Sequence, residues 1–248
     1  MILAVQGTMN KIAENLKILN ENIANVCARC NRQPSEITTV VVTKSANMEM
    51  IKQAVRLGCT ELGENRVQHL KITAEDIDAF INENSADPAI PKKINWHMIG
   101  HLQRNKVRQL LRNCQFIHSV DTLRVAEEVS KSAEKLLITP KILMQVNCSQ
   151  EPQKYGVPVG AAIHLAEQIV TMPNIKLVGL MTMAPLTLNK DLVKESFARA
   201  HELFEEIKGE KISGPDFKHL SMGMSQDYEL AIEHGATILR IGSAIFSG

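Results

Sequence analysis

The chain has 248 residues, with 28 lysines and arginines against 27 aspartates and glutamates, and a formal net charge of +1. This balance excludes a general nucleic-acid-binding protein, although it allows local basic patches. No apolar run approaches the roughly 20 residues of a membrane-spanning helix, and the first residues lack the basic segment and cleavage site of a signal peptide. We therefore expect a cytoplasmic protein that does not enter a membrane and is large enough to bury a substantial core.

The chain is predicted to begin with a helix over residues 1–31. Short apolar segments rich in β-branched residues then alternate with amphipathic segments of helical length, such as 47–58, 121–136, 159–172 and 191–208. Residues 83–93 are predicted to form a surface loop. The predicted strands are 37–44, 59–64, 94–100, 115–120, 140–148, 175–183, 217–224 and 236–243.

This alternation implies parallel strands joined by helical crossovers. Eight such units in 248 residues favour a closed (β/α)₈ TIM barrel, and an open, doubly wound sheet is the alternative. The chain ends soon after the eighth predicted strand, without a final helix, so the N-terminal helix can cover the seam between the last strand and the first. Since no low-complexity linker divides the sequence, we predict one barrel domain over residues 1–248.

The cysteines and histidines give no convincing metal site. The five cysteines are odd in number and scattered, which is typical of reduced thiols in the cytoplasm. Cys27 and Cys30 form a C-x-x-C pair without a second pair, and helix packing is the favoured interpretation. His97 and His101 are four residues apart, but on a predicted strand and without the glutamate of a helical zinc-protease motif.

Small and polar residues end the last two predicted strands, where TIM barrels commonly bind phosphate. One strand ends in Ser221-Met222-Gly223-Met224-Ser225, and the other in Arg240-Ile241-Gly242-Ser243. Small residues let backbone N–H groups approach an anion, and a helix N-terminus adds its dipole. Either stretch alone could be a tight turn, but both together favour a phosphate site.

Lys44 ends the first predicted strand, which lies beside the eighth strand in a closed barrel. An amine next to a phosphate site suits a ligand that carries both a carbonyl and a phosphate. Pyridoxal 5′-phosphate (PLP) and sugar phosphates both meet this description. Asn65, after the second strand, could bind a ring substituent or cap a helix, and His97 is expected to pack or hydrogen-bond near the barrel mouth. The basic helix 104–112 is interpreted as a solvated face, with a docking surface as the alternative.

Several long motifs occur together in the order found in one family. The sequence resembles the pyridoxal phosphate homeostasis proteins, whose fold is similar to the barrel domain of bacterial alanine racemase, the type III fold of PLP proteins. The motifs are VVVTK ending at Lys44, LGENRVQ at 62–68, WHMIGHLQRNKV at 96–107, QVN at 145–147, VGLMTM at 178–183, LSMGMSQD at 220–227 and GATILRIGSAIF at 235–246.

The resemblance implies that Lys44 holds PLP as a Schiff base. It implies that the phosphate is held by Ser221, Met222, Gly242 and Ser243. Arg240 would face the pyridine nitrogen, where a permanent cation opposes protonation and weakens the electron sink of the cofactor. Asn65 would lie near the ring.

The resemblance therefore favours a PLP carrier that stores, buffers and delivers the cofactor, as a monomer acting on PLP-dependent apo-enzymes. Alanine racemase uses a second acid/base, a tyrosine from a separate β domain, whereas this chain contains only Tyr155 and Tyr228. A PLP-dependent amino-acid racemase is the main alternative. A Schiff-base aldolase and a pure interaction protein are the others.

Overall fold

The structure is a computed structural model that describes residues 2–247. Its strands form a closed parallel barrel in the order β4-β3-β2-β1-β9-β8-β7-β5, and pairing of β4 with β5 completes the ring. The predicted TIM barrel is confirmed. The barrel strands are β1 (Thr38–Val42), β2 (Glu61–Glu64), β3 (Asn95–Met98), β4 (Phe116–Val120), β5 (Lys141–Asn147), β7 (Lys176–Met181), β8 (His219–Ser221) and β9 (Ile238–Ile241). A two-residue strand, β6 (Val157–Pro158), adds to β5 and was not predicted.

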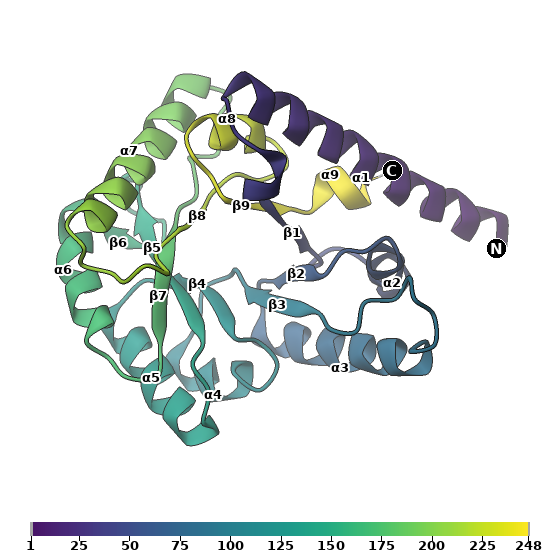
Figure 1. The fold of residues 1–248 in the computed structure, drawn as a ribbon, viewed down its shortest axis with the longest axis horizontal. Coiled ribbons are helices and arrows are strands. Elements are labelled where there is room, and N and C mark those ends of the chain that lie inside the picture. Colours follow the sequence, from purple (N-terminus) through teal and green to yellow (C-terminus); the bar gives the residue numbers. More distant parts are fainter. Residues whose placement is uncertain (1, 248) are drawn as a thin grey trace.

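Helices surround the barrel (Figure 1). Their bounds are α1 (Ile2–Arg29), α2 (Met48–Arg56), α3 (Val67–Glu83), α4 (Val107–Leu110), α5 (Leu123–Leu136), α6 (Val159–Val170), α7 (Lys190–Gly209), α8 (Tyr228–Glu233) and α9 (Ser243–Phe246). The predicted basic helix 104–112 is shorter than expected, because residues 104–106 form a 3₁₀ turn before α4. Across residues 2–247, no helix is long and apolar enough to cross a membrane.

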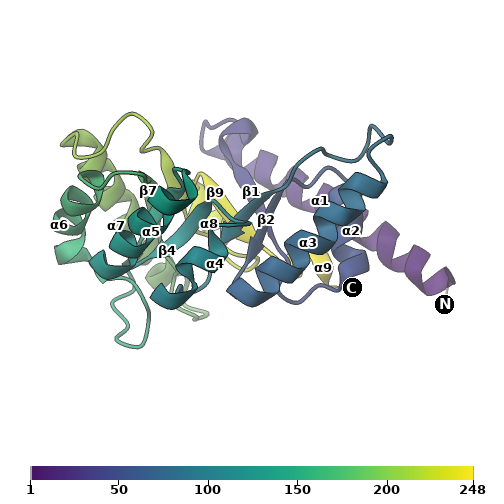
Figure 2. The same cartoon turned by 90° about the horizontal axis from the view of Figure 1, so that it is seen from below.

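Helix α1 lies over the seam between β9 and β1, where it contacts α2, α8 and α9. The side-chain amide of Asn15 donates to the carbonyls of Ile245 and Ser247, both at 3.0 Å. The two views place α6 at the end of the molecule opposite the N-terminal end of α1 (Figures 1 and 2). The expectation of no helix after the last strand was wrong, because the four residues of α9 follow β9 and pack under α1.

The two faces of the strands have different surroundings. Outward side chains and the helices form one large apolar core, which dominates the buried surface. A small apolar cluster lies apart from it, made of Val40, Leu143, Val178, Met181 and Ile238. Buried polar side chains, among them His97, His118, Ser221 and Arg240, are hydrogen-bonded from strand to strand inside the barrel. This polar content is unusual, because bulky branched residues usually fill the interior of a TIM barrel.

Candidate functional site

Lys44 lies in the turn between β1 and α2, at the carboxyl end of β1. The β-branched run Thr38–Val42 favours a strand, and Val40, Val41 and Val42 are buried. After the strand, the buried Thr43 hydroxyl hydrogen-bonds to the carboxylate of Glu64. Asn47 then caps α2 by accepting the backbone N–H of Met50 at 3.0 Å. The backbone on both sides of Lys44 is therefore fixed, while its own side chain is exposed.

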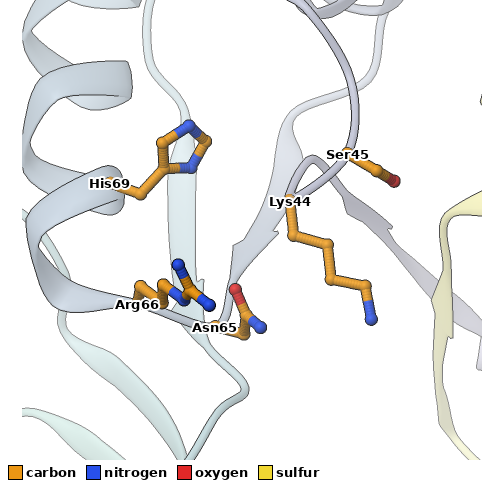
Figure 3. A pocket seen from close by; sticks show the side chains of 5 residues that line it. All are labelled: Lys44, Ser45, Asn65, Arg66 and His69. Atoms are coloured by element: carbon orange, nitrogen blue, oxygen red, sulfur yellow. The ribbon is translucent and has the colours of Figure 1, made fainter.

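The β2–α3 connection supplies the neighbours of Lys44. Glu64 is fully buried, and its Oε2 lies 3.0 Å from Nδ1 of His69 on α3. Asn65 follows directly and points toward the space beside Lys44, whereas Arg66 and His69 lie on the far side of it (Figure 3). Glu64 thus links the loop that carries Asn65 to the turn that carries Lys44.

The carboxyl ends of the strands enclose a cavity of about 480 Å³, which we call the mouth cavity. Its size falls within the range of small-molecule sites. It is lined by Val42, Lys44, Ser45, Asn65, Ile99, Gly100, His101, Gln145, Tyr155, Met183, Leu186, Met224, Ser225, Gln226, Arg240, Gly242 and Ser243. The structure thus brings together five of the eight predicted site residues, Lys44, Asn65, Arg240, Gly242 and Ser243.

Arg240 provides a fixed cation in the mouth cavity. It is 4% exposed, and its Nη1 donates to Ser221 Oγ at 2.8 Å while Nη2 donates to the carbonyl of Thr182 at 2.9 Å. Burial lowers the pKa of Arg240 to about 10, against the opposing effect of Asp227. The guanidinium therefore remains charged at neutral pH, in one orientation.

The loops after β8 and β9 must carry small residues. A Cβ on Gly223, whose φ is +92°, would lie 2.6 Å from Cβ of Ala231, and one on Gly242 would lie 3.2 Å from the carbonyl oxygen of Val42. Ser225 Oγ accepts the backbone N–H of Ala244 at 3.1 Å, so the two loops are joined. Glycines and hydroxyls at these places allow a ligand to approach the backbone.

Ser221 and Met222 do not line the mouth cavity. Both are fully buried. Strand β8 ends at Ser221, so it is shorter than the predicted strand 217–224. The backbone N–H of Met222 donates to the carbonyl of Ile238 at 3.1 Å and is thus unavailable to a ligand. The N–H of Met222 is therefore occupied within the barrel, and a role of Met222 in holding a phosphate stays a prediction. Ser221 is connected to the cavity through Arg240.

Met224, Ser225 and Gln226 line the cavity in their place; the first two belong to the stretch predicted to bind phosphate but were not predicted as site residues, and Gln226 was missed. They form the last part of the loop after β8, immediately before Asp227, the N-cap residue of α8. The signal was present in the sequence, because a small residue followed by a helix start marks the end of a βα loop.

His97 was expected near the mouth, and this was wrong. It lines a different cavity, of about 380 Å³, together with residues that begin strands, such as Thr38, Glu61 and Lys141. We call this the basal cavity, because it lies at the amino ends of the strands. His97 Nε2 lies 2.7 Å from Glu61 Oε2, and its Nδ1 lies 2.9 Å from Nε2 of His118. Strand alternation places His97 inside the barrel, but the register of β3 places it low in the barrel.

Burial of His118 predicts that stability depends on pH. Burial, with the charges of His97, Arg240 and His219, holds the pKa of His118 well below 6.5. Below pH 6.5 the unfolded chain takes up a proton here and the folded chain does not, so the free energy of unfolding should fall as the pH falls. The loss is at most about 1.4 kcal/mol per pH unit.

The free energy of unfolding, measured with urea between pH 7 and pH 5, should therefore change more steeply with pH for the wild type than for His118→Asn. His164→Asn, at an exposed position on α6, is the matched control and should keep the wild-type slope. Equal slopes for the wild type and His118→Asn would contradict the prediction.

Comparison with known proteins agrees with this geometry. A closed parallel barrel with a lysine after the first strand and small-residue loops after the last two is consistent with a barrel of the alanine racemase N-terminal type. The family described as "Alanine racemase, N-terminal domain" matches residues 15–248. The chain belongs to this family, and within it to the pyridoxal phosphate homeostasis proteins.

Two relatives and one solved structure support this assignment. The pyridoxal phosphate homeostasis protein of Aquifex aeolicus is 36% identical over 234 residues, which covers 94% of this chain and 96% of the relative. That of Escherichia coli K12 is 34% identical, with 96% and 97% covered. PipY of Synechococcus elongatus PCC7942, whose structure has PLP bound, is 30% identical with a TM-score of 0.75, and the match covers 91% of this chain and all of PipY.

Proposed function

We propose that this protein binds PLP in the mouth cavity, with the cofactor bonded covalently to Lys44, and serves to store, buffer and deliver it. The observation that carries the proposal is that one cavity unites a primary amine, a buried guanidinium and two small-residue loops. The PLP-bound structure of PipY and the names of the relatives support it.

The residues of the cavity fit the cofactor. PLP supplies an aldehyde that reacts with a lysine amine and a dianionic phosphate that needs donors. Lys44 provides the amine. Gly242, Ser243 and Ser225 would hold the phosphate, and Asn65 would lie against the ring. Arg240 would face the ring nitrogen, with its orientation fixed by Ser221 and Thr182.

A carrier fits this site better than a racemase does. Arg240 would stand where an electron sink needs an acid, because a cation opposes protonation of the ring nitrogen. Racemisation also needs an acid/base on each face of the substrate. Tyr155 lines the mouth cavity, but it is 56% exposed and stacks on His101 at 3.9 Å between ring centroids. Tyr228 is buried, and its hydroxyl lies 3.2 Å from Nδ2 of Asn22 on α1.

We further propose that the chain acts in the cytoplasm as one domain and as a monomer, with PLP-dependent apo-enzymes as the recipients. The described cysteines, Cys27, Cys30, Cys59, Cys114 and Cys148, are free thiols, which supports a reducing compartment.

Incubation of the PLP-loaded protein with a PLP-dependent apo-enzyme should restore that enzyme's activity. The apo-enzyme alone, and the apo-enzyme with cofactor-free protein, are the controls. The loaded protein itself should racemise common amino acids far below ordinary enzymatic rates, because each missing acid/base group costs roughly 10²–10⁴-fold. Racemisation at about 1 s⁻¹ or faster would overturn the carrier and establish the racemase.

A further inference from the structure

A continuous chain of hydrogen bonds crosses the barrel interior from the basal cavity to the mouth cavity. Glu61 Oε2 lies 2.7 Å from Nε2 of His97, and Nδ1 of His97 lies 2.9 Å from Nε2 of His118. Nδ1 of His118 lies 3.0 Å from Ser221 Oγ, which accepts from Nη1 of Arg240 at 2.8 Å. The middle members are 0–1% exposed. Because these residues are shielded from water, each of the hydrogen bonds has one defined donor and one defined acceptor.

The two ends determine that direction. Arg240 can only donate, and an ionised Glu61 can only accept. When both histidines are neutral, His97 must donate from Nε2 to Glu61 and accept at Nδ1. His118 must then carry its hydrogen on Nε2, so its Nδ1 accepts the Ser221 hydroxyl. Every hydrogen in the chain therefore points from Arg240 toward Glu61.

One added proton reverses the central bonds. An imidazolium at His97 donates from both nitrogens, so Nε2 of His118 must become an acceptor. His118 stays neutral, since burial holds its pKa well below 6.5. The proton balance is one proton from water: His118 gives its Nε2 hydrogen to His97 and receives the added proton on Nδ1. Ser221 Oγ then accepts from both His118 and Arg240, and its own hydrogen is released from His118.

We propose that Glu61, His97 and His118 form a proton switch that acts through Ser221 on Arg240 and so controls anion binding in the mouth cavity. They are positioning residues and do not touch the ligand. The proposal rests on the proposed function only in taking PLP as that anion. The protonated state holds one more positive charge in the barrel interior, so the anionic PLP should bind more tightly as the pH falls through the switch.

Glu61 is the acidic partner of His97 in the chain of hydrogen bonds. Burial tends to raise the pKa of Glu61, but hydrogen bonds from His97 and Asn95 and the charges of His97 and Lys141 hold it below its ordinary value. Glu61 is thus an ionised partner for an imidazolium. The other charged or titratable groups near the chain of hydrogen bonds are Lys141 on β5, Arg240 on β9 and His219 on β8, while Phe116 packs against the His97 ring.

The first test uses cofactor-free protein and ring-¹⁵N-labelled histidine. The chain has 8 histidines, few enough to assign by substitution. In an NMR titration, His118 should change from the Nε2–H to the Nδ1–H tautomer at the pH where His97 becomes an imidazolium. Glu61→Gln should lower that midpoint by about 1–3 units, since it removes the paired charge. Asp216→Asn removes an exposed carboxylate near His219 and outside the chain of bonds, and should leave the midpoint unchanged.

The second test compares PLP dissociation constants of Glu61→Gln and the wild type between pH 5 and 8. In their ratio, the intrinsic pH dependence of PLP and of Lys44 cancels. The ratio should be below one above the switch, where the wild type keeps a negative charge that the variant lacks, and should rise several-fold as the pH falls through the switch, whereas the Asp216→Asn ratio should stay flat. A His118 that keeps one tautomer wherever the protein is folded, or a flat Glu61→Gln ratio, would refute the switch. Absence of PLP binding at every pH would instead refute the proposed function, and the NMR titration would still test the switch.

Discussion

Lys44→Arg should abolish the covalent attachment of PLP while leaving the barrel folded. Arginine keeps the positive charge, but its guanidinium stays protonated and cannot form the imine. The measurement is borohydride reduction of the loaded protein followed by peptide mass spectrometry. The wild type should carry the pyridoxyl group on Lys44, and the variant should carry none. The visible absorption band of the PLP imine should also be absent from the variant.

Lys71→Arg is the control, because Lys71 lies on the exposed face of α3, 3.7 Å from Glu75 and outside the mouth cavity. It should bind PLP as the wild type does. Lys44→Arg should unfold at the same temperature as the wild type, because the exposed Lys44 contributes little to packing. Loss of PLP attachment would then result from the missing amine and not from a loss of the fold. A reduced adduct that persists in Lys44→Arg would assign the cofactor to another lysine.

Gly179→Ala should destabilise the barrel by about 3 kcal/mol or more. Gly179 lies on β7 at an irregularity in the register with β5, directly opposite His219 on β8. A Cβ at this position would lie 1.7 Å from the carbonyl oxygen of His219, so the two strands would have to separate. Urea unfolding monitored by circular dichroism measures the loss.

Gly160→Ala is the matched control for Gly179→Ala. A Cβ at Gly160 meets no atom within 4 Å, and the residue lies in α6. Alanine is the better helix former, so this variant should gain up to about 1 kcal/mol. A Gly179→Ala protein as stable as the wild type would mean that β7 and β8 are not packed as the structure has them.

The fold could be predicted because its signal is repeated. Each predicted strand contains an observed one, since apolar β-branched runs are buried between helices wherever they occur. The predicted ends of the strands were less accurate. The predicted strand 217–224 runs past the observed end of β8 at Ser221; backbone hydrogen bonds to β9 continue to Gly223, and the loop after it supplies Met224 and Ser225 to the cavity. Hydrophobicity indicates which residues are buried, and does not show where hydrogen bonding between strands stops.

The depth of a side chain in the barrel could not be predicted. Both His97 and Arg240 lie inside the barrel by strand alternation, yet one borders the basal cavity and the other the mouth cavity. Depth depends on the stagger of neighbouring strands, which is a property of the closed ring and not of any one strand. For the same reason, the chain of hydrogen bonds through His118 has no signature in the sequence.

The seam between β9 and β1 has a consequence for how the protein is made. Val40 pairs with Arg240 and Val41 with Ile241, so the first and last strands of the ring are neighbours. The two sides of the mouth cavity, Lys44 and Gly242, therefore come from opposite ends of the chain. During synthesis Lys44 leaves the ribosome early, and Gly242 follows only after nearly all of the residues between them have been made. Contacts this distant in sequence form late in folding. A nascent chain should thus be unable to retain the cofactor until β9 and Gly242 have left the ribosome.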